Sequence, residues 1–223
     1  KTQQYPANGK LFYQCIWLVL QNPDRVENPV RVSWKKTMST TITPLLPGNW
    51  YHIYNRGING ETLYHTEANY QYFLDVIVKY VFHAAKVYAY CLMKNHFHSL
   101  VSIRDDAERK PHLYFSDMFN SYTQGLNKQL GRGSLFERPF RRKVISSEKQ
   151  RVQVTFSIHN NPRHHGIMDD FVKYQYSFCR TVLSSVPTKI EREAVLSWFG
   201  GRDGFLAYHN AGCDDISDNL ILE

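Results

Sequence analysis

The sequence has few cysteines and no apolar run long enough to cross a membrane. Its four cysteines are Cys15, Cys91, Cys179 and Cys213. None forms a C-x-x-C pair, which excludes a zinc ribbon, and a disulfide framework is not expected in a chain of 223 residues. The longest apolar run, 11–20, contains Gln14 and has on the order of half of the ~20 residues that span a bilayer. We therefore expect a cytoplasmic protein with reduced thiols and no membrane partner.

Acidic side chains are outnumbered. The chain has 27 basic and 20 acidic residues, which give a formal net charge of +7 and a pI near 9.2. This balance favours a polyanionic partner, with nucleic acid ahead of an acidic membrane surface. The hydrophobic content of 43% and the aromatic content of 14% are those of a globular protein with a core, and they argue against disorder in its main body.

The beginning of the chain is the part whose status the sequence leaves open. The chain starts with Lys1, and Met38 opens a stretch that resembles a natural start before the first convincing strand. We interpret residues 1–37 as an extension that need not be native and assign no function to them. Residues 38–223 are predicted to form one domain, with a helical tail from about residue 187.

Hydrophobic periodicity predicts an alternation of strands and helices. Strands are predicted over 50–55, 86–93, 96–103 and 142–145, and helices over 66–82, 111–130, 147–160 and 189–199. The third helix is expected to end near Asn160, since the residue before Pro162 disfavours helical backbone. This order predicts an α+β fold, a ferredoxin-like antiparallel sheet with helices packed on one face.

His96 and His98 are the first residues that indicate chemistry. Residues two apart on a strand point to the same face of the sheet, so both imidazoles are expected to project together. Two neutral imidazoles suit a divalent metal, and a third ligand has to come from elsewhere in the fold. A histidine pair on a polar strand face is by itself more often inert, so the pattern needs support from its context.

That context is a resemblance carried by four segments in order along the chain. They are 51–57 (YHIYNRG), 91–101 (CLMKNHFHSLV), 133–143 (GSLFERPFRRK) and 158–166 (IHNNPRHHG). Together they closely resemble the REP-associated tyrosine transposases, which are single-tyrosine insertion-sequence transposases of the HUH superfamily. The superfamily takes its name from a His-hydrophobic-His motif on a sheet strand, which matches His96-Phe97-His98.

The resemblance implies a function, a cofactor and partners. Such transposases cut and rejoin single-stranded DNA at hairpin-bearing repeats, so the implied partner is single-stranded or hairpin DNA, and many act as homodimers. A divalent metal, Mg²⁺ or Mn²⁺, is implied on His96 and His98, with Asn161 completing its shell. A tyrosine from the later helix attacks the phosphorus and forms a covalent link.

At the nucleophile this chain departs from the family pattern. The tyrosine belongs four residues before the Asn of the Asn-Pro pair, where this chain has Ser157. A serine hydroxyl ionises less readily than a phenol and its side chain is several ångströms shorter. Three interpretations follow: cleavage is lost and DNA binding kept, Tyr122 of the preceding helix has taken over, or an offset of one residue changes which position faces the metal.

The basic loop after the second long helix is the predicted DNA surface. Its candidate contacts, together with one arginine after the Asn-Pro pair, are Arg132, Phe136, Arg138, Phe140, Arg141, Arg142, Lys143 and Arg163. Arginines pair with phosphates and phenyl rings stack on unpaired bases. The alternative is a solvated loop with Phe136 and Phe140 in the core. His164 and His165 are expected to contact phosphate. His52 could approach the metal from the neighbouring strand, but we expect an exposed strand histidine.

Two other functions stay open at this stage. A non-catalytic binder of hairpin DNA, a domesticated or decayed transposase, differs from the enzyme only by the consequence of Ser157. An RNA-binding ferredoxin-like domain would need exposed aromatic rings on its central strands, where this chain has His96 and His98 instead.

Overall fold

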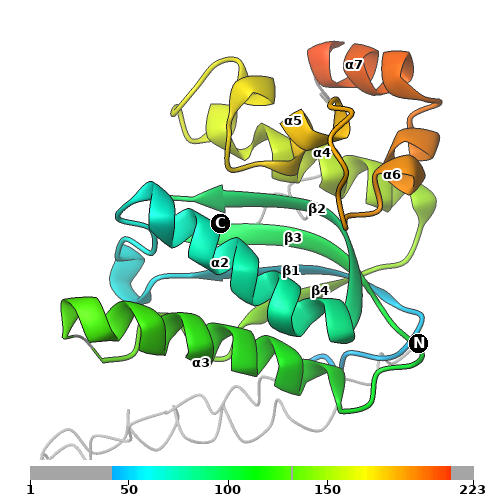
Figure 1. Cartoon of the computed structure of the whole chain (residues 1–223). Helices are drawn as coiled ribbons and strands as arrows, with labels where there is room; N and C mark the ends of the chain where they lie inside the picture. The colour runs from blue at the N-terminus through cyan, green and yellow to red at the C-terminus, as the bar shows by residue number, and fades with distance from the viewer. Residues whose placement is uncertain (1–41, 132, 212–223) are drawn as a thin grey trace, which may run out of the picture. The chain divides into compact units, whose positions relative to one another are not determined.

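A four-stranded antiparallel sheet is the centre of the computed structural model, which describes residues 42–131 and 133–211 (Figure 1). The strands are β1 (Trp50–Arg56), β2 (Ala85–Met93), β3 (His96–Ile103) and β4 (Arg141–Ile145), in the sheet order β2-β3-β1-β4. The long helices are α2 (Glu67–Tyr80), α3 (Pro111–Leu130) and α4 (Glu148–His164). This βαββαβ order with antiparallel neighbours confirms the predicted α+β, ferredoxin-like class.

Local sequence signals account for the ends of these elements. Thr66 and Asn69 form a capping box at the start of α2, and the Ser147 hydroxyl accepts the Gln150 N–H at the start of α4. Gly131, with φ 63°, ends α3 in the left-handed conformation that glycine adopts without strain. Gly57 ends β1, where a Cβ would lie 2.1 Å from the Glu61 carbonyl oxygen, so only glycine fits.

The first face of the sheet is covered by α2 and α3. Tyr51 and Ile53 from β1 and Leu92 from β2 pack with Phe73 of α2 and Tyr122 of α3 in one buried cluster. The strands place these side chains on one face because their residues alternate. Burial of this aromatic-rich layer accounts for the helical periodicity seen in both helices.

The second face carries α4 and the helices that follow it. Tyr88 and Met93 from β2 and Leu100 from β3 pack against Val154 and Phe156 of α4 in a separate buried cluster. Figure 1 shows α4 with α5 to α7 on the side of the sheet opposite to α2 and α3. The prediction placed helices on one face only. Helices cover both faces because apolar residues occupy both faces of β2 and β3.

Helix α4 continues through Pro162, which corrects the predicted end near Asn160. A proline has no N–H and leaves the carbonyl four residues earlier without its helical donor. Here the Asn161 amide donates to that carbonyl, Ile158 O, at 3.4 Å and to Ser157 O at 2.9 Å. The side chain before the proline thus replaces the missing backbone donor, and the helix runs on to His164.

The segment after α4 folds back onto it. Its helices are η3 (Phe171–Lys173), α5 (Phe178–Val182), α6 (Arg192–Trp198) and α7 (Arg202–Ala211). Helix α6 lies within the predicted 189–199 helix, and α7 lies within the helical tail predicted from about residue 187, although its bounds were not predicted. Among the residues that the structure describes, no helix is long and apolar enough to cross a membrane. The extension assigned to 1–37 lies outside the described residues.

Candidate functional site

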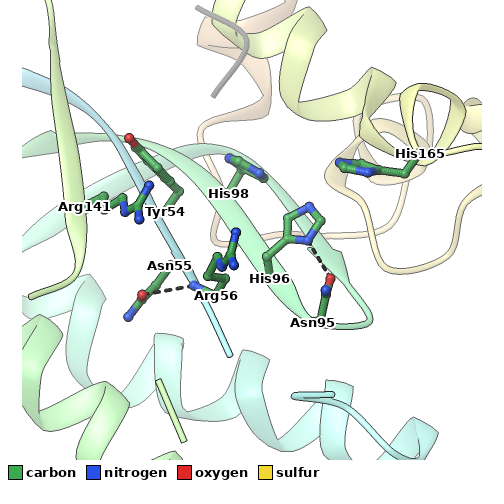
Figure 2. Close-up of a pocket in the computed structure, with 8 residues that line it drawn as sticks. All are labelled: Tyr54, Asn55, Arg56, Asn95, His96, His98, Arg141 and His165. Carbon is green, nitrogen blue, oxygen red and sulfur yellow. Dashed lines mark hydrogen bonds between the residues drawn. The ribbon is translucent and has the colours of Figure 1, made fainter. Parts of the chain in front are cut away.

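His96 and His98 lie side by side on the α4 face of the sheet. Their ring centroids are 5.2 Å apart, and both rings border a pocket of about 300 Å³. Figure 2 shows the other side chains of this pocket, which are Tyr54, Asn55, Arg56, Asn95, Arg141 and His165. The prediction that both imidazoles project from one face is confirmed by this geometry.

The proton of His96 is fixed by the turn before β3. The Asn95 amide oxygen lies 2.8 Å from His96 Nδ1 (Figure 2). Because an amide oxygen only accepts, Nδ1 carries the proton and Nε2 carries a lone pair. This hydrogen bond orients the ring with its lone pair away from Asn95, which is how metal-binding histidines are usually supported.

His98 has a corresponding partner in His52 of β1. His52 Nε2 lies 3.0 Å from His98 Nδ1, and both side chains are buried. When His98 donates from Nδ1, its Nε2 is left as a lone pair, in parallel with His96. The prediction of an exposed His52 is wrong, since its side chain is 2% exposed. Only the register of β1 against β3, which periodicity does not contain, reveals this pair.

Asn161 of α4 brings an oxygen to the same histidines. Its amide nitrogen is turned back to the helix carbonyls of Ser157 and Ile158. Its side chain also hydrogen-bonds His96 and thereby raises the pKa of that ring. The structure therefore brings His96 and Asn161 together, and because the amide nitrogen of Asn161 donates to the helix carbonyls, the oxygen is the atom that meets the His96 ring.

His165 joins the group from the end of α4. Its ring centroid lies 4.8 Å from that of His96, and its backbone N–H donates to the backbone carbonyl oxygen of Asn161 at 3.0 Å. The sequence interpretation had the helix break before this residue and gave His165 a phosphate contact. Because α4 continues through Pro162 to His164, His165 lines the pocket together with His96 and His98, and its contact with phosphate stays a prediction.

Burial keeps these histidines neutral. It lowers the pKa of His52 to about 3, with a smaller contribution from the charge of Lys143. Burial is also the main reason that the pKa of His96 is lowered to about 4, with His165 adding to the effect. The pKa of His98 is lowered well below its usual value by burial and by the neighbouring histidines. Their lone pairs are therefore free of protons at neutral pH, as metal binding requires.

Ser157 lies one helical turn before Asn161 on α4 and is half-buried. Spacing of i and i+4 places both residues on the same helix face. The position that the resemblance gives to the nucleophile is thus on the helix that closes the site. Nothing in the fold supports a shift by one residue, because Phe156 is buried in the second core cluster and Ile158 is buried as well.

Tyr122 is excluded as a substitute nucleophile. It lies on α3, fully buried in the cluster on the other face of the sheet. Its hydroxyl donates to Leu63 O at 2.7 Å, and burial raises the pKa of the phenol. The sheet separates this hydroxyl from His96 and His98, so the fallback assignment to Tyr122 is wrong, and its apolar spacing reflects core packing.

The predicted basic loop splits between the two faces of the sheet. In β4 the alternation places Arg141 and Lys143 on the site face, paired in register with Tyr54 and His52 of β1. Arg142 points to the opposite face, where its guanidinium lies 4.1 Å from the Phe140 ring centroid. Of the three consecutive cations, Arg141 and Lys143 therefore face the histidines and Arg142 does not.

A shared carboxylate holds two arginines at the mouth of the pocket. Glu137 accepts from Arg56 Nε at 2.8 Å and from Arg141 Nη2 at 3.1 Å. Arg56, the last residue of β1, pairs in register with His96. Neither Arg56 nor Tyr54 was predicted as a site residue. Both belong to the YHIYNRG segment, and positions 52, 54 and 56 lie on one face of a strand.

The two phenyl rings expected to stack on bases are in the core. Phe136 packs with Phe119 and Tyr122, and Phe140 packs with Phe115 and Phe119. Both are buried, so neither offers a ring face to a base, and the core alternative for them is the correct one. Both rings are apolar, and they are buried because the loop between α3 and β4 packs on the first core cluster.

The remaining predicted contacts have partners outside the histidine pocket. Arg138 is exposed and donates to Asn120 on α3 at 3.1 Å. Arg163 donates to Asp169 O at 2.8 Å and stacks 4.6 Å from the Phe171 ring centroid, so it also supports the turn after α4. Arg132 lies outside the described residues.

The donor set fits a small divalent metal. His96 and His98 offer imidazole nitrogens whose other nitrogens are hydrogen-bonded, and Asn161 offers an amide oxygen. Mixed nitrogen and oxygen ligands suit Mn²⁺, and Mg²⁺ is compatible where water supplies the remaining oxygens. His52 Nδ1 is buried and has no hydrogen-bond partner. The hydrogen bond between His52 and His98 therefore leaves one polar atom unsatisfied, as expected where the orientation of His98 for a metal determines the geometry.

Comparison with known proteins supports the fold. No protein-family model matches the sequence, and no curated protein matches it. Among solved structures the chain is similar to one described as a REP-associated tyrosine transposase bound to a REP hairpin. The identity is 16%, the TM-score is 0.54, and the match covers 67% of this chain and 89% of the other. The likeness therefore extends over nearly the whole of that protein and shows a shared α+β fold.

Proposed function

We propose that this chain is a transposase-like protein that binds single-stranded DNA beside a hairpin and has lost efficient cleavage. The observation that carries the proposal is the pocket itself. It joins His96, His98 and Asn161 to a basic strand edge, on a fold similar to that of a transposase bound to a REP hairpin. Ser157 stands at the position where the resemblance requires a tyrosine.

The DNA would lie across the open part of the α4 face. Helix α4 packs on β2 and β3, while Arg141 and Lys143 on β4 and Arg56 on β1 border the pocket or extend from it. Cations that line one face of a sheet in this way can pair with successive phosphates of a single strand. The Tyr54 ring stacks on His98 at 5.7 Å with its planes 16° apart, and it lines the pocket as an aromatic surface for a base.

His96, His98 and Asn161 are the residues that would hold a divalent metal, with Asn95 and His52 fixing the two rings. A bound metal supplies Lewis-acid help to a phosphate on which charge develops. Arg56 and Arg141 would orient the same phosphate once it displaces Glu137. These residues bind and position a phosphodiester, and none of them supplies a nucleophile.

The missing function is the attack on phosphorus. Ser157 is on the correct helix, but its hydroxyl is shorter and harder to ionise than a phenol. Tyr54 is the only tyrosine that lines the pocket within the part of the chain that is described, and its hydroxyl points away from His96 in Figure 2. The alternative function, an enzyme that still cuts and rejoins DNA, would need a nucleophile that this pocket lacks.

A cleavage assay decides between the two functions. Wild type, Ser157→Tyr and the matched control Ser157→Phe are incubated with 5′-labelled hairpin DNA carrying a single-stranded flank, in Mg²⁺ or Mn²⁺. We expect wild type and Ser157→Phe to bind without cutting, and Ser157→Tyr to form a covalent adduct that denaturing gels resolve. Addition of His96→Ala to Ser157→Tyr should abolish the adduct. Cleavage by wild type would overturn the proposal in favour of the enzyme.

We also propose that the protein acts as a homodimer, as the resemblance implies. Light scattering coupled to gel filtration, with and without hairpin DNA, tests this. A mass of 26.2 kDa for the protein component at micromolar concentration, both alone and in the DNA complex, would contradict it.

A further inference from the structure

A second histidine cluster lies among the helices that follow the sheet. His159 of α4, Cys179 of α5 and His209 of α7 place one ligand atom each within 4.8 Å of one another. All three side chains are buried, at 0%, 0% and 1% exposure. They come from three helices separated by 20 to 50 positions along the sequence, as their numbers show. The cluster contains none of the residues assigned to the pocket of His96 and His98.

The hydrogen bonds of this cluster leave one buried ring nitrogen without a partner. His209 Nδ1 lies 2.8 Å from the Phe205 carbonyl oxygen, which only accepts, so His209 carries its proton there and has a lone pair on Nε2. His159 Nδ1, 3.1 Å from that lone pair, then has to donate. His159 Nε2 is left as a buried lone pair with no partner. Such a group is rare in a folded protein and points to a missing ligand.

We propose that His159, Cys179 and His209 bind a structural zinc ion. Imidazole nitrogen and thiolate sulfur are the ligands that zinc prefers, and a buried site with one thiolate selects zinc over magnesium or manganese. Bond lengths of about 2.0–2.3 Å place ligand atoms roughly 3.3–3.8 Å apart around a tetrahedral ion. The ligand atoms of the three side chains lie within 4.8 Å of one another, so side-chain movements of about an ångström would close the site around the ion. A water molecule would complete the four-coordinate shell.

Charge and proton balance are consistent with zinc. Burial raises the pKa of the Cys179 thiol to about 12, and the Asp170 carboxylate adds to this effect. The metal-free cysteine is therefore a thiol, and zinc binding exchanges its proton for the Zn–S bond and releases that proton to solvent. The negative charge of Asp170 near the sulfur partly offsets the charge of the bound ion.

The ion would tie the three helices together behind the DNA site. Helix α4 carries Ser157 and Asn161 on one side and His159 on the buried side toward α7. The cluster shares its core with Phe178 and Phe205, which are fully buried beside it. Zinc is therefore proposed to stabilise the position of α4 and to take no part in chemistry. The proposal is independent of whether the protein binds or cuts DNA.

Cobalt substitution of the full chain tests the site. Co²⁺ bound to a thiolate gives a charge-transfer absorption that a site of histidine and asparagine cannot give, so the spectrum separates this cluster from His96 and His98. We expect one equivalent of Co²⁺ to produce the band in wild type and in His96→Ala. The band should be lost in Cys179→Ser and kept in Cys91→Ser, which changes another fully buried cysteine outside the cluster.

Further measurements keep the test decisive if Cys179→Ser does not fold. His209→Gln should lower the Co²⁺ affinity at least about tenfold, as loss of a ligand or its support does. Joint replacement of Cys15 and Cys213 by serine should leave the band unchanged. Zinc should raise the melting temperature of metal-free wild type. Absence of the charge-transfer band in wild type, or its persistence in folded Cys179→Ser, would overturn the proposal.

Discussion

Replacement of His52 separates metal affinity from fold stability. His52 and His98 are hydrogen-bonded at 3.0 Å in a place where their side chains are 2% and 5% exposed, so no solvent can replace a lost partner. In His52→Leu, the Nδ1–H of His98 loses its acceptor, and the ring is no longer held with Nε2 toward the pocket. Loss of such an outer partner typically lowers metal affinity by about 10- to 100-fold, or roughly 1.4–2.7 kcal/mol.

The metal-free protein should respond differently to the same change. His52 Nδ1 is buried without a partner, so leucine removes one unsatisfied polar group while it leaves another on His98. These two effects oppose each other, and we expect a change in the free energy of unfolding of less than about 1 kcal/mol. His52→Gln places an amide oxygen near the former Nε2 and should restore most of the metal affinity.

Calorimetric titration with Mn²⁺ and urea unfolding in EDTA measure the two quantities. The hydrogen-bond argument fails if folded His52→Leu binds Mn²⁺ within threefold of wild type. It also fails if His52→Gln is as weak as His52→Leu, because packing and not the acceptor would then determine affinity.

Four further predictions follow from the same contacts. Lys143→Gln should reduce the slope of log affinity for single-stranded DNA against log salt by about 0.7, while Lys86→Gln, on the far edge strand, leaves it unchanged; fluorescence anisotropy between 50 and 200 mM salt measures both. Glu137→Gln should tighten DNA binding at low salt, since Glu137 competes with phosphate for two arginines, and weaker binding in the same assay would contradict this. Tyr122→Phe should lower the free energy of unfolding by about 0.5–1.5 kcal/mol through the lost hydrogen bond and leave DNA affinity unchanged. Burial lowers the pKa of His52 to about 3 in the folded protein. The contribution of this neutral ring to the free energy of unfolding is therefore fully present above pH 6.5 and is lost as the pH falls toward 3, by about 1.4 kcal/mol per pH unit. Urea unfolding in EDTA should show a smaller fall in the free energy of unfolding between pH 7 and pH 5 for His52→Gln than for wild type.

The order of strands and helices was predictable because it depends on local signals. The alternation in 50–55 and 96–103, the cap at Ser147 and the proline at Pro111 each act within a few residues. The shared face of His96 and His98 follows from the strand period alone. The end of α4 was not predictable from the proline rule, because the Asn161 side chain supplies the donor that Pro162 lacks.

Hydrophobic periodicity could not predict which side chains contact the predicted site residues. His52 meets His98 only through the register of two strands that lie 40 residues apart in the sequence. The division of the basic loop also depends on where β4 begins. A start at Arg141 turns Arg141 and Lys143 to the histidines and Arg142 to the core, and a shift by one residue would reverse all three.

The support around His96 and His98 favours the proposed DNA binding without cleavage. Under that proposal only one position has to differ, Ser157, where the family resemblance implies a tyrosine. The proposed metal ligands differ, because each ring depends on a hydrogen-bonding partner: half-buried Asn95 for His96, and buried His52 for His98. Such a network is costly when it is only partly satisfied, and under the proposed function a bound metal would complete it. The proposed function leaves this chain able to hold a phosphodiester and without an attacking group, and we therefore expect Ser157→Tyr alone to be sufficient for covalent attack.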